Sequence, residues 1–277
     1  MPYLRTMARN AVPAELVRTL LVLACVLSAM GGEQARRTEG PRPPALTTDS
    51  IVQKLVAANA RRAEALHGYR QTRSYSLNYH GFPGGRSAAM KVDASFTAPE
   101  KKEFTVVSQS GSQFLINHVL QKLLDSEKDA WQGQNGKQME LTPDNYDFTF
   151  LQMDRTPQGE SYVLAVKPKV NSKYLYKGKI WVDARDFAVT RIAAQPAKNP
   201  SFWVSRTEID THYAKFGDFW LPLHNESVTH VRFGGDAVLQ IDYADYQING
   251  ASQIQNAHPS GQVPVLPPAT SVSGDPH

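Results

Sequence analysis

Cysteine is almost absent from this chain of 277 residues, which contains only Cys25. That residue lies inside an apolar N-terminal run, so the rest of the chain can form neither a disulfide nor a thiolate metal site. A domain built from the remaining residues must therefore be stabilised by its own packed core.

A long hydrophobic run is also absent. The longest apolar segment, Leu20 to Met30, is shorter than the ~20 residues that a transmembrane helix needs. A basic stretch with Arg5, Arg9 and Arg18 precedes it, and the small-residue sequence Ala29-Met30-Gly31 ends it. This order is typical of a cleavable secretory signal, so we expect a signal peptide over residues 1–31 and a periplasmic protein.

Two other interpretations of the N-terminal segment remain open. The apolar run could be retained as a signal anchor. Alternatively, Cys25 follows Val22-Leu23-Ala24, which resembles the sequence before a lipid-modified cysteine. We favour cleavage without lipid anchoring, because Val26 and Leu27 continue the apolar region where a lipoprotein would begin a polar tether.

The chain lacks a strong excess of charge of either sign. Its formal net charge is +4, of which the signal segment contributes +2. No basic cluster reaches the density that binding to nucleic acid or to an anionic membrane requires. We therefore expect no nucleic-acid partner.

Recognisable catalytic motifs are missing as well. The sequence has no G-x-S-x-G nucleophile elbow, and Gly81 to Gly85 has neither the spacing nor the lysine of a phosphate-binding loop. The carboxylate pairs Asp183/Asp186 and Asp242/Asp245 fall at expected turns and strand ends, where aspartate is common for structural reasons. We expect no catalytic residue, no cofactor and no enzyme.

The strongest metal-ligand pattern is His224, Glu226 and His230, which would share one face of a strand. His224 and His230 would nevertheless lie about 20 Å apart along an extended strand, too far to share an ion. We interpret them as polar residues on a solvated face and expect no metal. A metalloenzyme or hydrolase using them is the minor alternative.

Two helices are predicted within the domain. Residues 32–46 form a Pro-rich linker and residues 251–277 a Pro-rich tail that we expect to be disordered, which leaves one domain over 47–250. Capping residues at Thr47 to Ser50 followed by apolar residues at helical spacing predict a first helix up to Gly68. A second amphipathic helix is predicted between Gly111 and Trp131.

The remaining segments favour strands. The clearest runs from Ala88 to Phe96, with apolar and polar residues alternating. About ten such segments, separated mostly by short turns, predict a mainly β (α+β) fold. We expect an incomplete antiparallel β-barrel of about ten strands, with the N-terminal helix and a lid helix on its concave side. Periodicity leaves open whether the interior is a filled core or an apolar pocket.

This order of elements, over about Thr48 to Ile248, resembles the periplasmic lipoprotein-carrier superfamily of LolA and LolB, which includes the amino-terminal domain of RseB. The most specific stretch is Lys177 to Ile192, which reads as a strand, an Asp183-x-x-Asp186 turn and a strand containing Arg191. Pro196 to Trp203 follows, as in envelope proteins of this type.

The resemblance implies a monomer that binds the acyl chains of lipoproteins or lipids in a lidded hydrophobic cavity, as lipoprotein-sorting proteins do. The cavity would be lined by strand residues Tyr75, Leu77, Met90, Val92, Phe96, Phe104, Val106, Phe148 and Phe150. The lid would present Phe114, Leu115, Val119 and Leu123. The alternative is a non-catalytic envelope sensor or scaffold that binds a protein partner, such as a membrane protein, through sheet edges or through Trp203 and Trp220.

Overall fold

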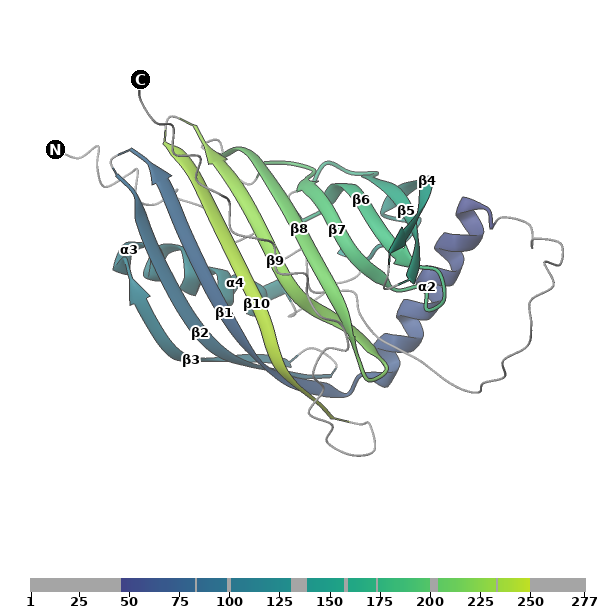
Figure 1. Cartoon of the computed structure of the whole chain (residues 1–277), viewed down its shortest axis with the longest axis horizontal. Coiled ribbons are helices and arrows are strands. Elements are labelled where there is room, and N and C mark those ends of the chain that lie inside the picture. The colour runs from purple at the N-terminus through teal and green to yellow at the C-terminus, as the bar shows by residue number, and fades with distance from the viewer. Residues whose placement is uncertain are drawn as a thin grey trace, which may run out of the picture.

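Ten strands form one open antiparallel sheet in the computed structural model of the chain (Figure 1). The structure describes residues 46–82, 84–98, 101–130, 139–156, 159–172, 174–199, 204–232 and 234–249. The predicted signal segment and tail lie outside these ranges, as does the predicted linker up to residue 45. The mainly β architecture with an N-terminal helix and one further helix is confirmed.

The strand bounds are β1 Gly68–Gly81, β2 Arg86–Thr97, β3 Lys101–Gly111, β4 Tyr146–Thr156, β5 Gly159–Pro168, β6 Tyr176–Asp183, β7 Val189–Pro196, β8 Val204–Phe216, β9 Phe219–Val231 and β10 Gly235–Asn249. Their order across the sheet is β3-β2-β1-β10-β9-β8-β7-β6-β5-β4. The sequential strands β3 and β4 therefore occupy opposite edges. The chain between them crosses the whole sheet, and this crossing places a helix over one face.

The helix α2 (Thr48–Ala65) covers one half of that face. Thr47 caps it, since its hydroxyl accepts a hydrogen bond of 3.2 Å from the N–H of Ser50. Its buried side chains pack on the inner residues of β4 to β8. We call this group the α2 cluster; it comprises Ile51, Val52, Leu55, Leu141, Tyr146, Leu164, Val166, Leu175, Tyr176, Ile180, Val182, Val189, Ile192, Ala194, Ile209 and Tyr213.

The segment 113–130 covers the other half, and we call it the lid helix. It consists of α3 (Gln113–Leu115), a π-helical turn (Ile116–Leu120) and α4 (Gln121–Ala130), as the spacing between Gly111 and Trp131 predicted. Wide π turns are rare and occur mostly at functional positions. Within the described ranges, no helix is long and apolar enough to cross a bilayer.

The turn between β6 and β7 attaches α2 to the sheet. The carboxylate of Asp183 accepts hydrogen bonds from the backbone N–H groups of Arg185 (2.9 Å) and Asp186 (2.7 Å), which closes the turn. The buried guanidinium of Arg62, on α2, donates to the carbonyl oxygens of Asp186 and Phe187. The stretch that suggested the family resemblance is therefore the docking point of the first helix.

The carboxylate of Asp186 extends this connection to β8 and β9. It accepts a hydrogen bond of 2.6 Å from Lys215 and one of 2.8 Å from the indole N–H of Trp220. Trp220 is half-buried, so it is not the exposed aromatic surface that we expected. Trp203 lies outside the described residues.

We predict that Arg62→Met lowers the free energy of unfolding by about 2–3 kcal/mol, because it leaves two buried carbonyl groups without a charged donor. Arg61→Met, at the exposed neighbouring position, is the matched control and is expected to change stability by less than about 0.5 kcal/mol. Urea unfolding of both variants measures the difference. Equal stabilities would contradict the docking role of Arg62.

Candidate functional site

The lid helix packs on an apolar face built by β1, β2, β9 and β10. We call this group the lid cluster. Its buried members are Leu66, Tyr69, Tyr75, Leu77, Ala88, Met90, Val92, Phe96, Leu115, Ile116, Val119, Leu120, Leu123, Leu124, Phe216, Phe219, Leu221, Ala237, Leu239, Ile241, Tyr243 and Tyr246. Five predicted cavity residues (Tyr75, Leu77, Met90, Val92 and Phe96) and three predicted lid residues (Leu115, Val119 and Leu123) thus lie in one contiguous cluster.

The other predicted residues lie at the margins of the helix-covered face. Phe104 and Phe114 are half-buried against the lid cluster, and Phe148 is half-buried against the α2 cluster. Val106 on β3 pairs with Val92, and Phe150 on β4 pairs with Leu164, so both occupy the predicted face. They are 41% and 40% exposed because they belong to the two edge strands.

A row of buried polar side chains separates the two apolar clusters. Thr207 and Thr211 on β8, with Asn225, Ser227 and Thr229 on β9, are all buried on the helix-covered face. Thr207 and Thr229 share a hydrogen bond of 3.2 Å, and Asn225 donates one of 2.7 Å to Thr211. The floor of this face is therefore apolar under each helix and polar between them.

Three ionised side chains fasten the lid helix to the sheet. Glu127 of α4 accepts a hydrogen bond of 2.8 Å from Arg73 of β1 and another of 2.8 Å from Lys102 of β3. The side chains of Arg73 and Glu127 are each 1% exposed and that of Lys102 is 2% exposed. Burial of ions is costly unless they are paired, so this triad favours one position of the lid helix.

A wider network supports the arginine. Arg73 also donates to the hydroxyl of Tyr75 (3.3 Å), and its guanidinium lies 5.2 Å from the ring centroids of Phe104 and Tyr243. With its amide oriented by these partners, the oxygen of Gln71 accepts from Nε and Nη2 of Arg73 at 2.8 Å. Three strands (β1, β3 and β10) and the lid helix thus meet around one buried guanidinium.

The triad also shifts the pKa values of its members. Burial alone would raise the pKa of Glu127, but the charges and hydrogen bonds of Arg73 and Lys102 outweigh it and hold the pKa below the ordinary 4.5. Burial lowers the pKa of Lys102 to about 8, although Glu127 partly opposes this shift. At neutral pH all three groups are therefore charged.

These three residues were not predicted from the sequence. Arg73 occurs at an inward position of the β1 alternation, between Gln71 and Tyr75, and Glu127 follows Leu123 and Leu124 at helical spacing. In each case the available signal was a charged residue at a position where the strand alternation or helical spacing places apolar residues. Which charges would meet could not be read from it, because β1, β3 and α4 are far apart in sequence.

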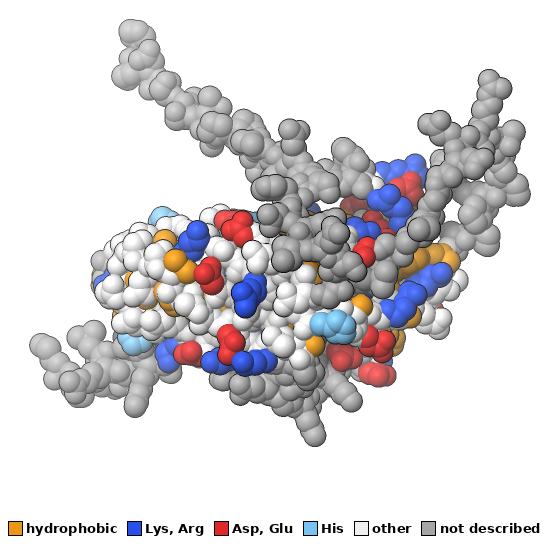
Figure 2. Space-filling model, turned by 90° about the horizontal axis from the view of Figure 1, so that it is seen from below, with side chains coloured by type: hydrophobic (Ala, Val, Ile, Leu, Met, Phe, Trp, Pro, Cys, Tyr) orange, Lys and Arg blue, Asp and Glu red, His pale blue; other side chains and the backbone are white. Residues whose placement is uncertain are grey.

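The predicted metal pattern does not converge. His224, Glu226 and His230 lie on the face without helices, and each contacts a different residue of β10. His224 lies 2.6 Å from Asp242, His230 lies 2.6 Å from Asp236, and Glu226 accepts from Gln240 at 2.8 Å. Acidic and basic side chains are interspersed on the view in Figure 2.

No family model and no curated protein matches the chain. Solved structures of the LolA superfamily match it. A LolA superfamily protein from Nitrosomonas europaea is 14% identical, with 73% of this chain and 93% of that chain covered and a TM-score of 0.34. An outer membrane lipoprotein-sorting protein domain from Vibrio parahaemolyticus is 10% identical, with coverages of 73% and 92% and a TM-score of 0.41.

The MucA/MucB complex of Pseudomonas aeruginosa also matches, at 9% identity, with 69% of this chain and 93% of that chain covered and a TM-score of 0.26. The structures that this chain is similar to thus include members of the superfamily that its sequence resembles. At such identities the likeness concerns the fold, and the association of MucB with MucA is a property of those proteins.

We predict that Glu127→Gln lowers the free energy of unfolding by about 3–5 kcal/mol near neutral pH, because it leaves two buried cations without their anion. The folded-state pKa of Glu127 lies below its unfolded value, so its contribution is present above pH 4.5 and is lost as the pH falls through the folded pKa. The stability difference between the native protein and the variant should therefore shrink below pH 4.5.

Asp125→Asn, an exposed change on the same helix, is the matched control for this experiment. Chemical unfolding of the three proteins at several pH values gives the comparison. A difference that stayed constant at acidic pH, or a control as unstable as Glu127→Gln, would show that the charge of Glu127 is not what stabilises the lid helix.

Proposed function

We propose that this chain is a non-catalytic periplasmic binding protein that takes the acyl chain of a lipid or lipoprotein between the lid helix and the sheet. The observation that supports this is the lid cluster, an extended apolar face covered by one helix that ionised side chains fasten in place. An acyl chain would replace the apolar contacts of the helix when it lifts. Each buried CH₂ contributes about 0.8 kcal/mol, so burial alone could hold such cargo.

The charged fastening favours a helix that can move. The Coulomb attraction of a buried ion triad is largely offset by desolvation, whereas well-packed apolar residues at the same positions would hold the helix as firmly or more so. When the helix lifts, Arg73, Lys102 and Glu127 regain hydration. Closed and open positions would therefore differ less in free energy than they would with an apolar contact.

Uptake of a fluorescent fatty-acyl probe by the delipidated protein tests the proposal, and we expect saturable binding. The informative variant is the triple substitution Arg73→Met, Lys102→Met and Glu127→Leu. It should keep or raise stability, since apolar replacements of buried ion triads are often neutral or stabilising, and it should reduce uptake by holding the lid helix down. Absence of saturable uptake by the native protein would refute acyl binding.

A second candidate function is binding of a protein partner at the β4 edge. Phe150, Leu151 and Met153 are exposed on this edge strand, which pairs only with β5. An exposed apolar edge strand can accept an added strand from another chain. This edge would suit the sensor or scaffold role better than the half-buried Trp220.

We predict that Leu151→Lys abolishes copurification of any protein partner that binds this edge while leaving acyl-probe uptake unchanged. Lysine on an edge strand opposes the addition of another strand. Affinity purification of both proteins from the same envelope extract makes the comparison. A partner retained by the variant would place its binding elsewhere.

A further inference from the structure

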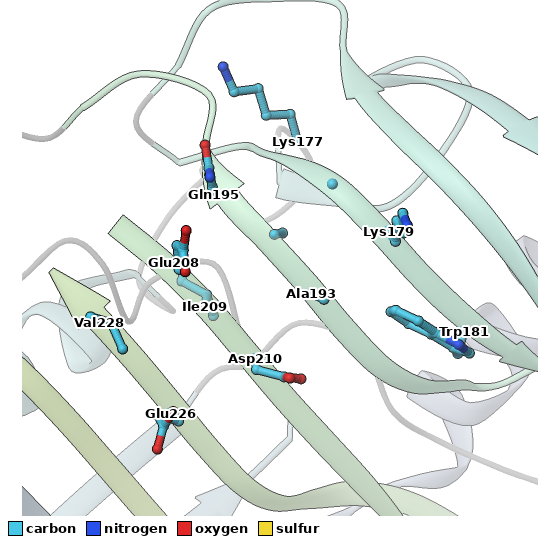
Figure 3. Close-up of a pocket in the computed structure, with 12 residues that line it drawn as sticks. Lys177, Lys179, Trp181, Ala193, Gln195, Glu208, Ile209, Asp210, Glu226 and Val228 are labelled. Atoms are coloured by element: carbon cyan, nitrogen blue, oxygen red, sulfur yellow. The ribbon is translucent and has the colours of Figure 1, made fainter. Parts of the chain in front are cut away.

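Two adjoining depressions lie on the helix-free face, over β6 to β9 (Figure 3). The larger has a volume of about 760 Å³ and the smaller about 350 Å³. Both are lined by Lys177 and Gln195, so we treat them as one groove. Its size is that of a site for a small molecule.

The groove has a structural cause in two strand pairs. Where β6 passes β7, Gly178 and Ala193 form a low floor between longer side chains, and a Cβ on Gly178 would lie only 2.3 Å from the carbonyl oxygen of Ala193. Pairing of β7 with β8 runs only from Arg191↔His212 to Ala194↔Ile209. Beyond that point the two strands diverge, and the smaller depression lies in this opening.

The carboxylates of the groove already have partners. Glu208 pairs with Arg206, Asp210 is held by Arg191 at 2.5 and 2.9 Å, and Glu226 accepts from Gln240. In Figure 3, these acids lie on β8 and β9, which β7 separates from the lysine-bearing β6. The charges of Glu208 and Asp210 are thus compensated by arginines, whereas the partner of Glu226 is a neutral amide.

The lysines of the groove differ from the acids. Within the described part of the chain, the side chains of Lys177 on β6 and Lys198 after β7 make no hydrogen bond or ion pair, and that of Lys179 on β6 interacts electrostatically with Asp154. Lys177 lines both depressions, Lys179 the larger one and Lys198 the smaller one. The groove therefore presents ammonium groups whose charge is available to a ligand.

Apart from its lysines and Arg206, the smaller depression is lined mostly by uncharged polar side chains. Its lining includes the amides and hydroxyls of Asn171, Gln195, Asn199, Ser205 and Thr207, next to the guanidinium of Arg206. Asn199 and Gln195 each use one amide atom internally, Asn199 as a donor to the carbonyl of Ser205. Groups of this kind provide both donors and acceptors, which suits ligand hydroxyl groups.

We propose that this groove binds a small anionic, hydroxylated ligand, namely a sugar or polyol that carries a phosphate. Lys177 and Lys198 pair with the phosphate, as lysine does as a compact charge, and the amide and hydroxyl lining binds the hydroxyl groups. The site lies on the face opposite the lid helix and is independent of acyl binding. The phosphorylated polyol could be free or could be the headgroup of a lipid.

The test is calorimetric titration of the full-length mature protein with myo-inositol 1-phosphate. Neutral myo-inositol and inorganic phosphate are the two ligand controls. We expect the polyol phosphate to bind at least tenfold more tightly than either control. The double variant Lys177→Met/Lys198→Met should weaken its binding at least tenfold, while Lys91→Met, an exposed lysine of β2 far from the groove, should leave it unchanged.

Vesicles of phosphatidylcholine with and without phosphatidylinositol distinguish the two sources. Lysine-dependent binding to the inositol vesicles but not to the free headgroup supports a lipid ligand, and tight binding of the free headgroup supports a soluble one. Binding of neutral inositol or of inorganic phosphate as tight as that of the polyol phosphate overturns the proposal. Unchanged affinity also overturns it, provided that the double variant has the same unfolding temperature as the native protein. Acyl-probe uptake is measured in parallel, so loss of one activity is separable from loss of the other.

Discussion

The ion triad of Arg73, Lys102 and Glu127 is the interaction on which the arrangement of this fold most depends. The lid helix belongs to a long crossover between opposite sheet edges, and it could lie at several positions over an apolar face. Apolar packing is not directional, whereas two cations that must reach one buried carboxylate allow very few positions. The guanidinium of Arg73 also contacts Tyr243 of β10, so the same interaction joins the lid helix to the strands on both sides of β1.

The two helices are attached by different physical means. Arg62 fastens α2 through two backbone carbonyl groups of a tight turn. The lid helix is fastened by side-chain charges, which regain hydration when they separate. In the proposed uptake mechanism the lid helix is the element that moves, and the polar row of β8 and β9 lies at the boundary between the two halves.

The two faces of the sheet have opposite characters. One carries both apolar clusters and both helices, and the other carries paired acids, histidine–aspartate contacts and a groove with available lysines. An amphiphile has the same two kinds of group, but the faces are separated by the sheet itself. Under the two proposals, an acyl chain and an anionic headgroup would therefore bind as two different ligands, or as parts of two separate lipid molecules.

The sequence by itself determined the element types, since period-two alternation and helical spacing depend only on neighbouring residues, as at Ala88 to Phe96 and Gln113 to Ala130. It also determined which face most of the predicted lining residues occupy. Only the tertiary structure decided that Val106 and Phe150 fall on exposed edges, that Trp220 is bound to Asp186, and that Arg73 meets Glu127. The physical reason is that strand order and the meeting of distant charges depend on contacts between residues far apart in the chain, which no local pattern encodes.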